Sequence, residues 1–216
     1  MTRRFDMTQP LTRGQGIKAA STSAKRGRVV LLPTESVYAV LVDAFSPTGV
    51  RAVRALKNRP DDAALPVAVS SLSMLRGIAE RLTPAGQSLV EAFWPGPLTI
   101  VCRAQPSLAW DAAGGGRTLT VRMPLHPIAL DVIGGMGPCV MVGADPPLDV
   151  DPAEHETPGI DVVLDAGPPP WPSERSSVVD VRVDPPVLLR TGALGHDRLV
   201  PVVADLVHEV VPEAPR

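Results

Sequence analysis

Short apolar runs alternate with amphipathic segments along the chain, and this pattern predicts strands and helices. The continuous run Val29–Leu32 is typical of a buried strand, whereas Thr118–Arg122 alternates polar and apolar residues and predicts a half-buried one. Leu72, Leu75 and Ile78 follow helical spacing. Strands are predicted over residues 29–32, 65–69, 98–102, 118–122, 139–142, 160–164, 177–183 and 187–190. Helices are predicted over residues 16–26, 46–60, 71–82, 83–93, 126–133 and 197–210.

Strands and helices do not alternate strictly, which favours an α/β fold with a twisted mixed sheet flanked by helices. A length of 216 residues fits one domain, which we expect to span residues 14–200. Residues 1–13 are polar and predict a flexible N-terminus, and residues 201–216 predict a terminal helix and tail.

Composition narrows the class of protein. Apolar residues make up 44% of the chain, enough for a substantial core, and the net charge of −2 gives no bulk attraction to nucleic acid or anionic membranes. Cys102 and Cys139 lie inside apolar runs without metal-binding spacing, so buried thiols are expected. The first residues do not resemble a leader, and no apolar segment has the length of a membrane span. These features predict a cytoplasmic protein with no membrane partner.

The segment from Val29 to Pro60 carries the first candidate site. Pro33 stops the predicted strand, and the turn Thr34–Ser36 follows it, at the end of a strand where open α/β sheets often bind ligands. Ser46 and the proline after it are typical of a helix start, and that helix leads to Lys57 and Arg59. A polar turn and two cations would suit an anionic ligand.

Several motifs in this order resemble the YrdC-like family, the threonylcarbamoyl-AMP synthases of tRNA modification. The motifs are Pro33-Thr34-Glu35-Ser36-Val37-Tyr38, Lys57-Asn58-Arg59-Pro60, Phe93-Trp94-Pro95-Gly96-Pro97-Leu98-Thr99, Val121-Arg122-Met123-Pro124-Leu125-His126-Pro127, Ser176-Ser177-Val178-Val179-Asp180 and Leu189-Arg190-Thr191-Gly192. The resemblance covers about residues 14–200, and it rests on the ordered set because each motif alone is weak.

The resemblance implies that ATP, bicarbonate and L-threonine give threonylcarbamoyl-AMP and pyrophosphate for the t6A modification of tRNA. It assigns Lys57 and Arg59 as catalytic residues; Lys57, Arg59, Thr118, Gly143 and Arg190 to ATP; and Thr34, Arg122 and Ser176 to L-threonine. Arg122 is a natural fork for a carboxylate. Mg²⁺ would bridge the phosphates, so no site built from protein ligands alone is expected. Double-stranded RNA and tRNA-modification proteins are further candidate partners.

Two segments differ from the family pattern. Met141-Val142-Gly143-Ala144-Asp145 stands where the family has a Ser-Thr-Ser-Ala-Asn type segment, and Ala39-Val40-Leu41 stands in place of Gly-Leu-Gly. Ionised Asp145 only accepts hydrogen bonds, and its charge would repel a triphosphate unless a cation intervenes. A second hypothesis is therefore a catalytically impaired YrdC-like paralogue that binds nucleotide or double-stranded RNA.

Each candidate also has a structural interpretation. Lys57 would complement a helix dipole, Thr34 would cap a turn, and Arg122 and Arg190 would form ordinary ion pairs. His126 would cap a helix. Arg51 and Arg54, on the helix that carries Lys57, would form a basic face for RNA or simply a solvated one, and the solvated face is the expectation.

Overall fold

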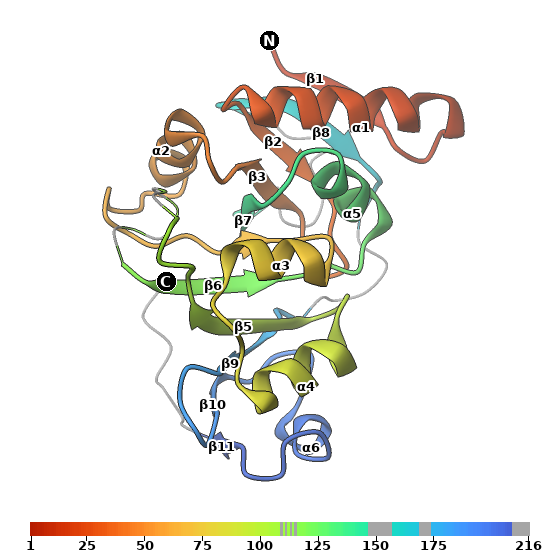
Figure 1. Ribbon diagram of the computed structural model, residues 1–216. Coiled ribbons are helices and arrows are strands. Elements are labelled where there is room, and N and C mark those ends of the chain that lie inside the picture. The colour runs from red at the N-terminus through yellow and green to blue at the C-terminus, as the bar shows by residue number, and fades with distance from the viewer. Residues whose placement is uncertain are drawn as a thin grey trace.

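One mixed sheet connects all the strands of the part of the chain that the structure describes. The structure is a computed structural model that describes residues 1–108, 110, 112, 114, 116–146, 157–168 and 174–208. Within these residues the sheet has eleven strands in the order β1-β8-β2-β3-β7-β4-β6-β5-β9-β10-β11 (Figure 1). Parallel and antiparallel pairs both occur, so the predicted fold class is confirmed.

The elements have the following bounds. The strands are β1 (Arg3–Asp6), β2 (Val29–Leu32), β3 (Ala39–Asp43), β4 (Val67–Ala68), β5 (Leu98–Arg103), β6 (Thr118–Arg122), β7 (Cys139–Gly143), β8 (Ile160–Asp165), β9 (Ser177–Asp180), β10 (Val187–Arg190) and β11 (Val207–His208). The helices are α1 (Pro10–Lys25), α2 (Pro47–Leu56), α3 (Leu72–Ile78), α4 (Pro84–Phe93), α5 (Pro127–Gly134) and α6 (His196–Leu199).

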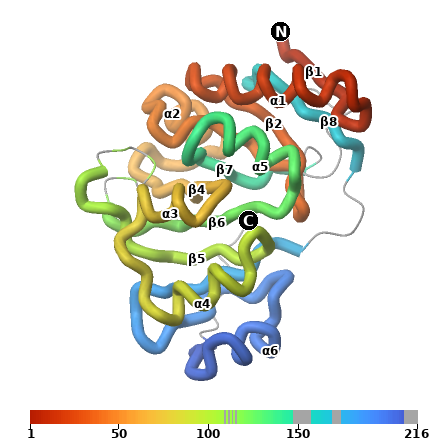
Figure 2. The backbone as a smooth tube through the Cα atoms, turned by 45° about the vertical axis from the view of Figure 1, so that its right-hand side comes forward, coloured from red at the N-terminus to blue at the C-terminus, as the bar shows by residue number. Residues whose placement is uncertain are grey.

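Helices cover the sheet from both sides and divide the core into two apolar clusters. Helices α1 and α5 pack on one face of β8, β2, β3 and β7. Residues of α2, α3 and α4 belong to the other cluster, with the opposite face of the sheet. Figure 2 shows α1, α2 and α5 towards one end of the molecule and α4 and α6 towards the other.

The sheet twists strongly between its two halves, and one face of β6 is polar. In Figure 1 strands β5 and β6 run across the direction of β2 and β3. Along β6, Leu119 and Val121 are buried, whereas Thr118, Thr120 and Arg122 alternate with them and keep partial exposure. The predicted alternation of this strand is confirmed, and it presents Arg122 on the polar face.

Side-chain caps fix the starts of three helices. Ser46 Oγ accepts a hydrogen bond from Gly49 N at 3.1 Å, and Ser71 and Thr83 cap α3 and α4 in the same way. Helix α2 ends at Lys57, its C-cap, and Asn58 then adopts a left-handed conformation with φ 48°. Lys57 therefore lies at the C-terminal end of α2, where the chain turns away from the helix.

The predictions for both ends of the chain and for one interior strand are wrong. Residues 1–13 are not a flexible terminus, because β1 pairs in parallel with β8 and α1 begins at Pro10. The last predicted helix stops at Leu199, and residues 207–208 form β11 instead; residues 209–216 lie outside the described residues. A strand that the sequence analysis omitted, β3, occupies the position between β2 and β7. No helix within the described residues is long and apolar enough to cross a membrane.

Candidate functional site

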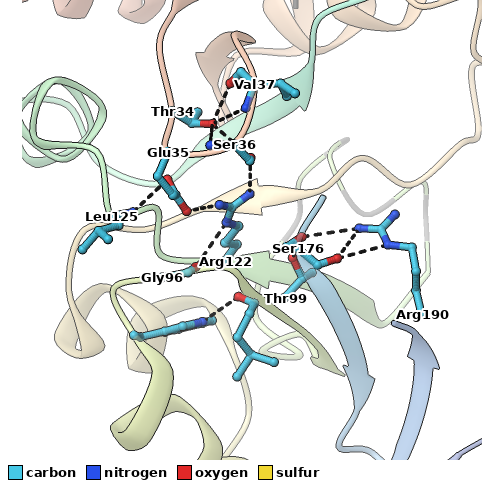
Figure 3. A network of polar contacts seen from close by, with 12 residues as sticks. Thr34, Glu35, Ser36, Val37, Gly96, Thr99, Arg122, Leu125, Ser176 and Arg190 are labelled. Atoms are coloured by element: carbon cyan, nitrogen blue, oxygen red, sulfur yellow. Dashed lines mark hydrogen bonds and ion pairs between the residues drawn. The ribbon is translucent and has the colours of Figure 1, made fainter. Parts of the chain in front are cut away.

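The loop between β2 and β3, residues 33–38, is organised by the hydroxyl of Thr34. This buried hydroxyl donates to Val37 O at 2.6 Å and accepts from the backbone N–H groups of Ser36 and Val37 at 3.2 Å. The predicted turn-capping role of Thr34 is therefore present. Its oxygen lies 3.2 Å from Ser36 Oγ, so two hydroxyls meet inside the loop (Figure 3).

Arg122 reaches this loop from the end of β6. Its Nη2 forms an ion pair with Glu35 Oε1, its Nη1 donates to Ser36 Oγ at 3.4 Å, and its Nε donates to Gly96 O at 3.3 Å. Glu35 also accepts from Leu125 N at 3.0 Å through Oε2 (Figure 3). The Arg122 and Glu35 side chains are only 12% and 16% exposed. The strands β2–β3 and β6 are not neighbours in the sheet, and the loop bridges them.

A second polar group lies beside Arg122 on the neighbouring strands. Thr99, on β5, is directly opposite Arg122, and its Oγ1 shares a hydrogen bond of 2.8 Å with Ser176 Oγ. Arg190, at the end of β10, donates to Ser176 O from Nε at 3.1 Å and from Nη2 at 2.9 Å. Figure 3 shows Arg122 and Arg190 on either side of Thr99 and Ser176. The structure thus brings Thr34, Arg122, Ser176 and Arg190 into one region.

The residues that follow β7 connect Lys57 to the same loop. Its ammonium group forms an ion pair with Asp145, and Ala144 N donates to Tyr38 O at 2.8 Å. Gly143 pairs with Ala39, and a Cβ added at Gly143 would lie 3.4 Å from Val37 Cγ2. Position 143 therefore borders the loop of Thr34 and has room for a small side chain.

Arg59 and Thr118 are placed differently from Arg122. Arg59 is exposed beyond the end of α2. Thr118 is at the opposite end of β6 from Arg122, about 13 Å along the strand at ~3.3 Å per residue. Its hydroxyl accepts from Arg182 Nη1 at 2.8 Å, at a cavity of about 310 Å³ lined by Arg103, Arg117, Thr118, Arg182 and Val183. The structure does not bring Thr118 beside Arg122.

His126 borders the Glu35 carboxylate without the hydrogen bond expected of a helix cap. It is the N-cap residue of α5, but its side chain makes no cap hydrogen bond. Its Nδ1 is buried and has no hydrogen-bond partner among the described residues. Burial lowers the pKa of His126, and the nearby Glu35 charge opposes that shift. The imidazole is therefore neutral near pH 7.

The arrangement offers cations and hydroxyls to an anionic ligand but no cluster of metal ligands. Among the described residues, no group of three or more His, Cys, Asp and Glu side chains lies close enough to hold a metal ion. Asp145 is the carboxylate beside Lys57, and its side chain is 70% exposed. One exposed carboxylate suits a Mg²⁺ ion that is held mainly by the phosphates of a nucleotide.

Four further residues contact site residues here: Glu35, Ser36, Thr99 and Gly96. Glu35 and Ser36 were expected only as part of the polar turn, and Thr99 and Gly96 had no predicted role. Glu35 carried a signal, because it lies in the turn that follows a buried strand and ionised side chains are rarely buried without a partner. Thr99 and Gly96 carried none, since their roles depend on strand pairing.

Comparison with known proteins places this chain in a family. Residues 22–192 match the family model of the Sua5, YciO and YrdC proteins, whose description reads "Telomere recombination". The chain belongs to the Sua5/YciO/YrdC family. It is 34% identical over 212 residues to a candidate threonylcarbamoyl-AMP synthase of Mycobacterium tuberculosis, covering 94% of this chain and 96% of that protein. It is 30% identical to the threonylcarbamoyl-AMP synthase of Pyrococcus abyssi, covering 90% of this chain and 59% of that protein.

Solved structures of the family have the same fold. A variant of Pyrococcus abyssi Sua5 superposes with a TM-score of 0.88 at 29% identity, and Sua5 complexed with L-threonine superposes with 0.85 at 28%. Each covers 97% of this chain, which spans 62% of the Sua5 chain. Escherichia coli YciO, at 20% identity and a TM-score of 0.73, shares the fold over 89% of this chain.

Proposed function

We propose that this protein makes threonylcarbamoyl-AMP from L-threonine, bicarbonate and ATP and releases pyrophosphate. The observation that carries the proposal is that Thr34, Arg122, Ser176 and Arg190 lie in one region. It occurs in a chain that matches a candidate synthase over nearly its whole length, and Sua5 binds L-threonine on the same fold.

The amino-acid end of the site would be Arg122 and the hydroxyls around it. A guanidinium presents parallel N–H groups that match a carboxylate, so Arg122 would hold the carboxylate of threonine. Thr34 and Ser176 provide hydroxyls that either donate or accept, which suits the polar groups of the same substrate. Strand pairing and the Gly96 carbonyl hold Arg122 in position.

The nucleotide end would be Lys57, Arg59 and Arg190. In the proposed reaction an oxygen of the threonine carbamate attacks the α-phosphorus of ATP, and pyrophosphate leaves. Such chemistry needs positioning and charge stabilisation more than a nucleophilic side chain. Mg²⁺, held by phosphate oxygens and by Asp145, would neutralise part of the phosphate charge. Thr118 is at the opposite end of β6 from Arg122. We propose that it contacts the nucleotide there rather than the amino acid.

The test is a pyrophosphate-release assay with ATP, Mg²⁺, bicarbonate and L-threonine, run beside Lys57→Ala. We expect threonine-dependent release that falls at least about tenfold in the variant, since a transition-state charge contact is worth more than ~1.4 kcal/mol. Lys18→Ala, which removes an exposed lysine of α1, should behave as the parent protein. Release that does not require threonine, or that survives Lys57→Ala, would refute the proposal.

One observation favours the impaired paralogue as the second candidate. The Lys57 ammonium is paired with Asp145 rather than left for a phosphate. If the parent protein releases no pyrophosphate but Gly143→Ser with Asp145→Asn restores release, the protein is a nucleotide-binding paralogue with a decayed site.

An RNA-binding face on α2 loses support. Arg54 is 4% exposed and donates two hydrogen bonds to Ala63 O, so it does not belong to the solvated basic face that the sequence predicted. As part of the proposed synthase function, the protein would act in the cytoplasm together with tRNA-modification proteins.

A further inference from the structure

The guanidinium that the proposed function assigns to the substrate carboxylate already holds a carboxylate of the protein. Arg122 and Glu35 form an ion pair that is largely buried, and Glu35 Oε2 is also satisfied by Leu125 N. Nε and Nη1 of Arg122 donate to Gly96 O and Ser36 Oγ. A ligand carboxylate therefore has to replace Glu35 rather than fill an open fork.

The cost of that replacement depends on what else the ligand carries. A ligand with only a carboxylate would pair with Arg122 and leave the Glu35 charge partly buried and unpaired, which is strongly unfavourable. A ligand with only an ammonium group would pair with Glu35 and leave the charge of Arg122 partly buried and unpaired. An α-amino acid carries both charges on one carbon and can satisfy both partners at once.

We propose that Glu35 and Arg122 together recognise the zwitterion of a free α-amino acid by exchanging their ion pair for two new ones. Arg122 takes the ligand carboxylate, and Glu35 takes the ligand ammonium group. This inference rests on the proposed function, because it concerns the same substrate site. It makes Glu35 a specificity-determining residue that selects amino acids against hydroxy acids and amines.

The surroundings of the pair support an exchange in which Glu35 is the member that moves. Arg122 belongs to β6, which pairs with β4 and β5, and two of its N–H groups are bound outside the pair. Glu35 belongs to a loop, and within the described residues its only hydrogen bond besides those with Arg122 comes from the backbone N–H of Leu125, an exposed residue. Small rotations of the Glu35 side chain would open the fork while keeping its carboxylate nearby.

The test measures binding by calorimetry without ATP, for L-threonine and for 2,3-dihydroxybutanoate, in which a hydroxyl replaces the ammonium group. We expect the parent protein to prefer threonine by at least about 100-fold. In Glu35→Gln the preference should fall below about tenfold, because the amide leaves no stranded charge. The readout is the ratio of the two affinities. Glu35→Gln removes both a competitor for Arg122 and a partner for the ammonium group, so the affinity for threonine alone would mix two opposite effects.

Two further variants exclude a merely structural role. Glu91→Gln, an exposed glutamate of α4, should keep the full preference. Glu35→Asp retains the charge on a shorter side chain and should also keep the preference, and it carries the test if Glu35→Gln fails to fold. An unchanged preference in folded Glu35→Gln, or a lost preference in Glu35→Asp, would overturn the inference.

Pyrophosphate release separates this failure from failure of the proposed function. A protein that shows threonine-dependent release, but whose Glu35→Gln variant keeps the preference, refutes only the exchange of ion pairs. A parent protein that neither binds threonine nor releases pyrophosphate refutes both.

Discussion

The ammonium group of Lys57 and the carboxylate of Asp145 form an ion pair in which the two partners differ greatly in exposure. The Lys57 side chain is 9% exposed, whereas that of Asp145 is 70% exposed. Lys57 is held at the end of α2, and Asp145 follows β7. The aspartate can therefore leave the pair with little disturbance, and a phosphate can take its place.

Asp145→Asn should lower the KM for ATP by about two- to fivefold. The substitution removes a competitor for Lys57 and a negative charge near the phosphates, and exposed ion pairs are worth at most about 1 kcal/mol. The dependence on Mg²⁺ should shift to higher metal concentration, because one carboxylate ligand is lost. Initial rates over a matrix of ATP and Mg²⁺ concentrations measure both effects.

The matched control is Asp131→Asn, which removes an exposed carboxylate of α5 that pairs with Arg13 of α1. It should leave both titrations unchanged. A higher KM for ATP in Asp145→Asn at saturating Mg²⁺ would contradict the competition between Asp145 and the phosphates for Lys57.

Thr99→Val should weaken both the fold and threonine binding. Valine has the shape of threonine but cannot share the 2.8 Å hydrogen bond with Ser176 Oγ, so that hydroxyl loses a buried partner. We expect a loss of about 1 kcal/mol in the free energy of unfolding, and a raised KM for threonine with little change in kcat. Urea unfolding and steady-state kinetics check the two effects.

Thr120→Val, on the polar face of the neighbouring strand β6, serves as the control. Its KM for threonine should match that of the parent protein. Equal effects of the two substitutions would show that the Thr99–Ser176 hydrogen bond has no special role.

Asp161 should make the protein more stable above about pH 4 than below it. Its Oδ2 accepts from Ser23 Oγ at 2.6 Å, and Arg3 and Arg28 pair with the same carboxylate. The Ser23 hydrogen bond is the largest of these effects, and together they lower the pKa of Asp161 to about 2. Because the pKa is lower in the folded state than its ordinary value, this stabilisation is complete above about pH 4 and is lost as the pH falls towards 2.

Asp161→Asn should therefore reduce the free energy of unfolding by about 1 kcal/mol at pH 6, since the ion pairs are partly exposed. The difference from the parent protein should shrink between pH 4 and pH 2, as followed by urea titrations. Asp205→Asn, in an exposed turn, should show no such trend. A difference that stays constant with pH would contradict the linkage.

Local pattern was sufficient for most of the sheet and for most helix starts. Runs such as Val29–Leu32 are buried on both faces, and the Ser46 cap forms as predicted. The last helix was extended too far, although Pro201 carried the signal: a proline lacks the N–H that a helix interior requires. Residues 39–42 also carried a signal, as a continuous apolar run, but no strand was predicted there.

Other features depend on partners that are distant in sequence. The polar segment Arg3–Asp6 is a strand because β8 pairs with it, and nothing local indicates this. Arg54 is buried on α2, where spacing alone suggested a solvated face. In the site, the residue types of Thr34, Arg122 and Ser176 could be anticipated from motifs. The Glu35 and Thr99 contacts could not, because each joins residues that are far apart in sequence.

The position of β8 between β1 and β2 affects how the chain can fold during its synthesis. Arg3 and Asp161 are bonded to one another yet lie 158 residues apart. At ~5–20 residues per second, a ribosome would need roughly 8–30 s to make that interval. Throughout this time β1 and one edge of β2 would lack their partner strand, and such unpaired edges promote association with other chains. The nascent N-terminal segment is therefore where we expect chaperones to engage this protein on the ribosome.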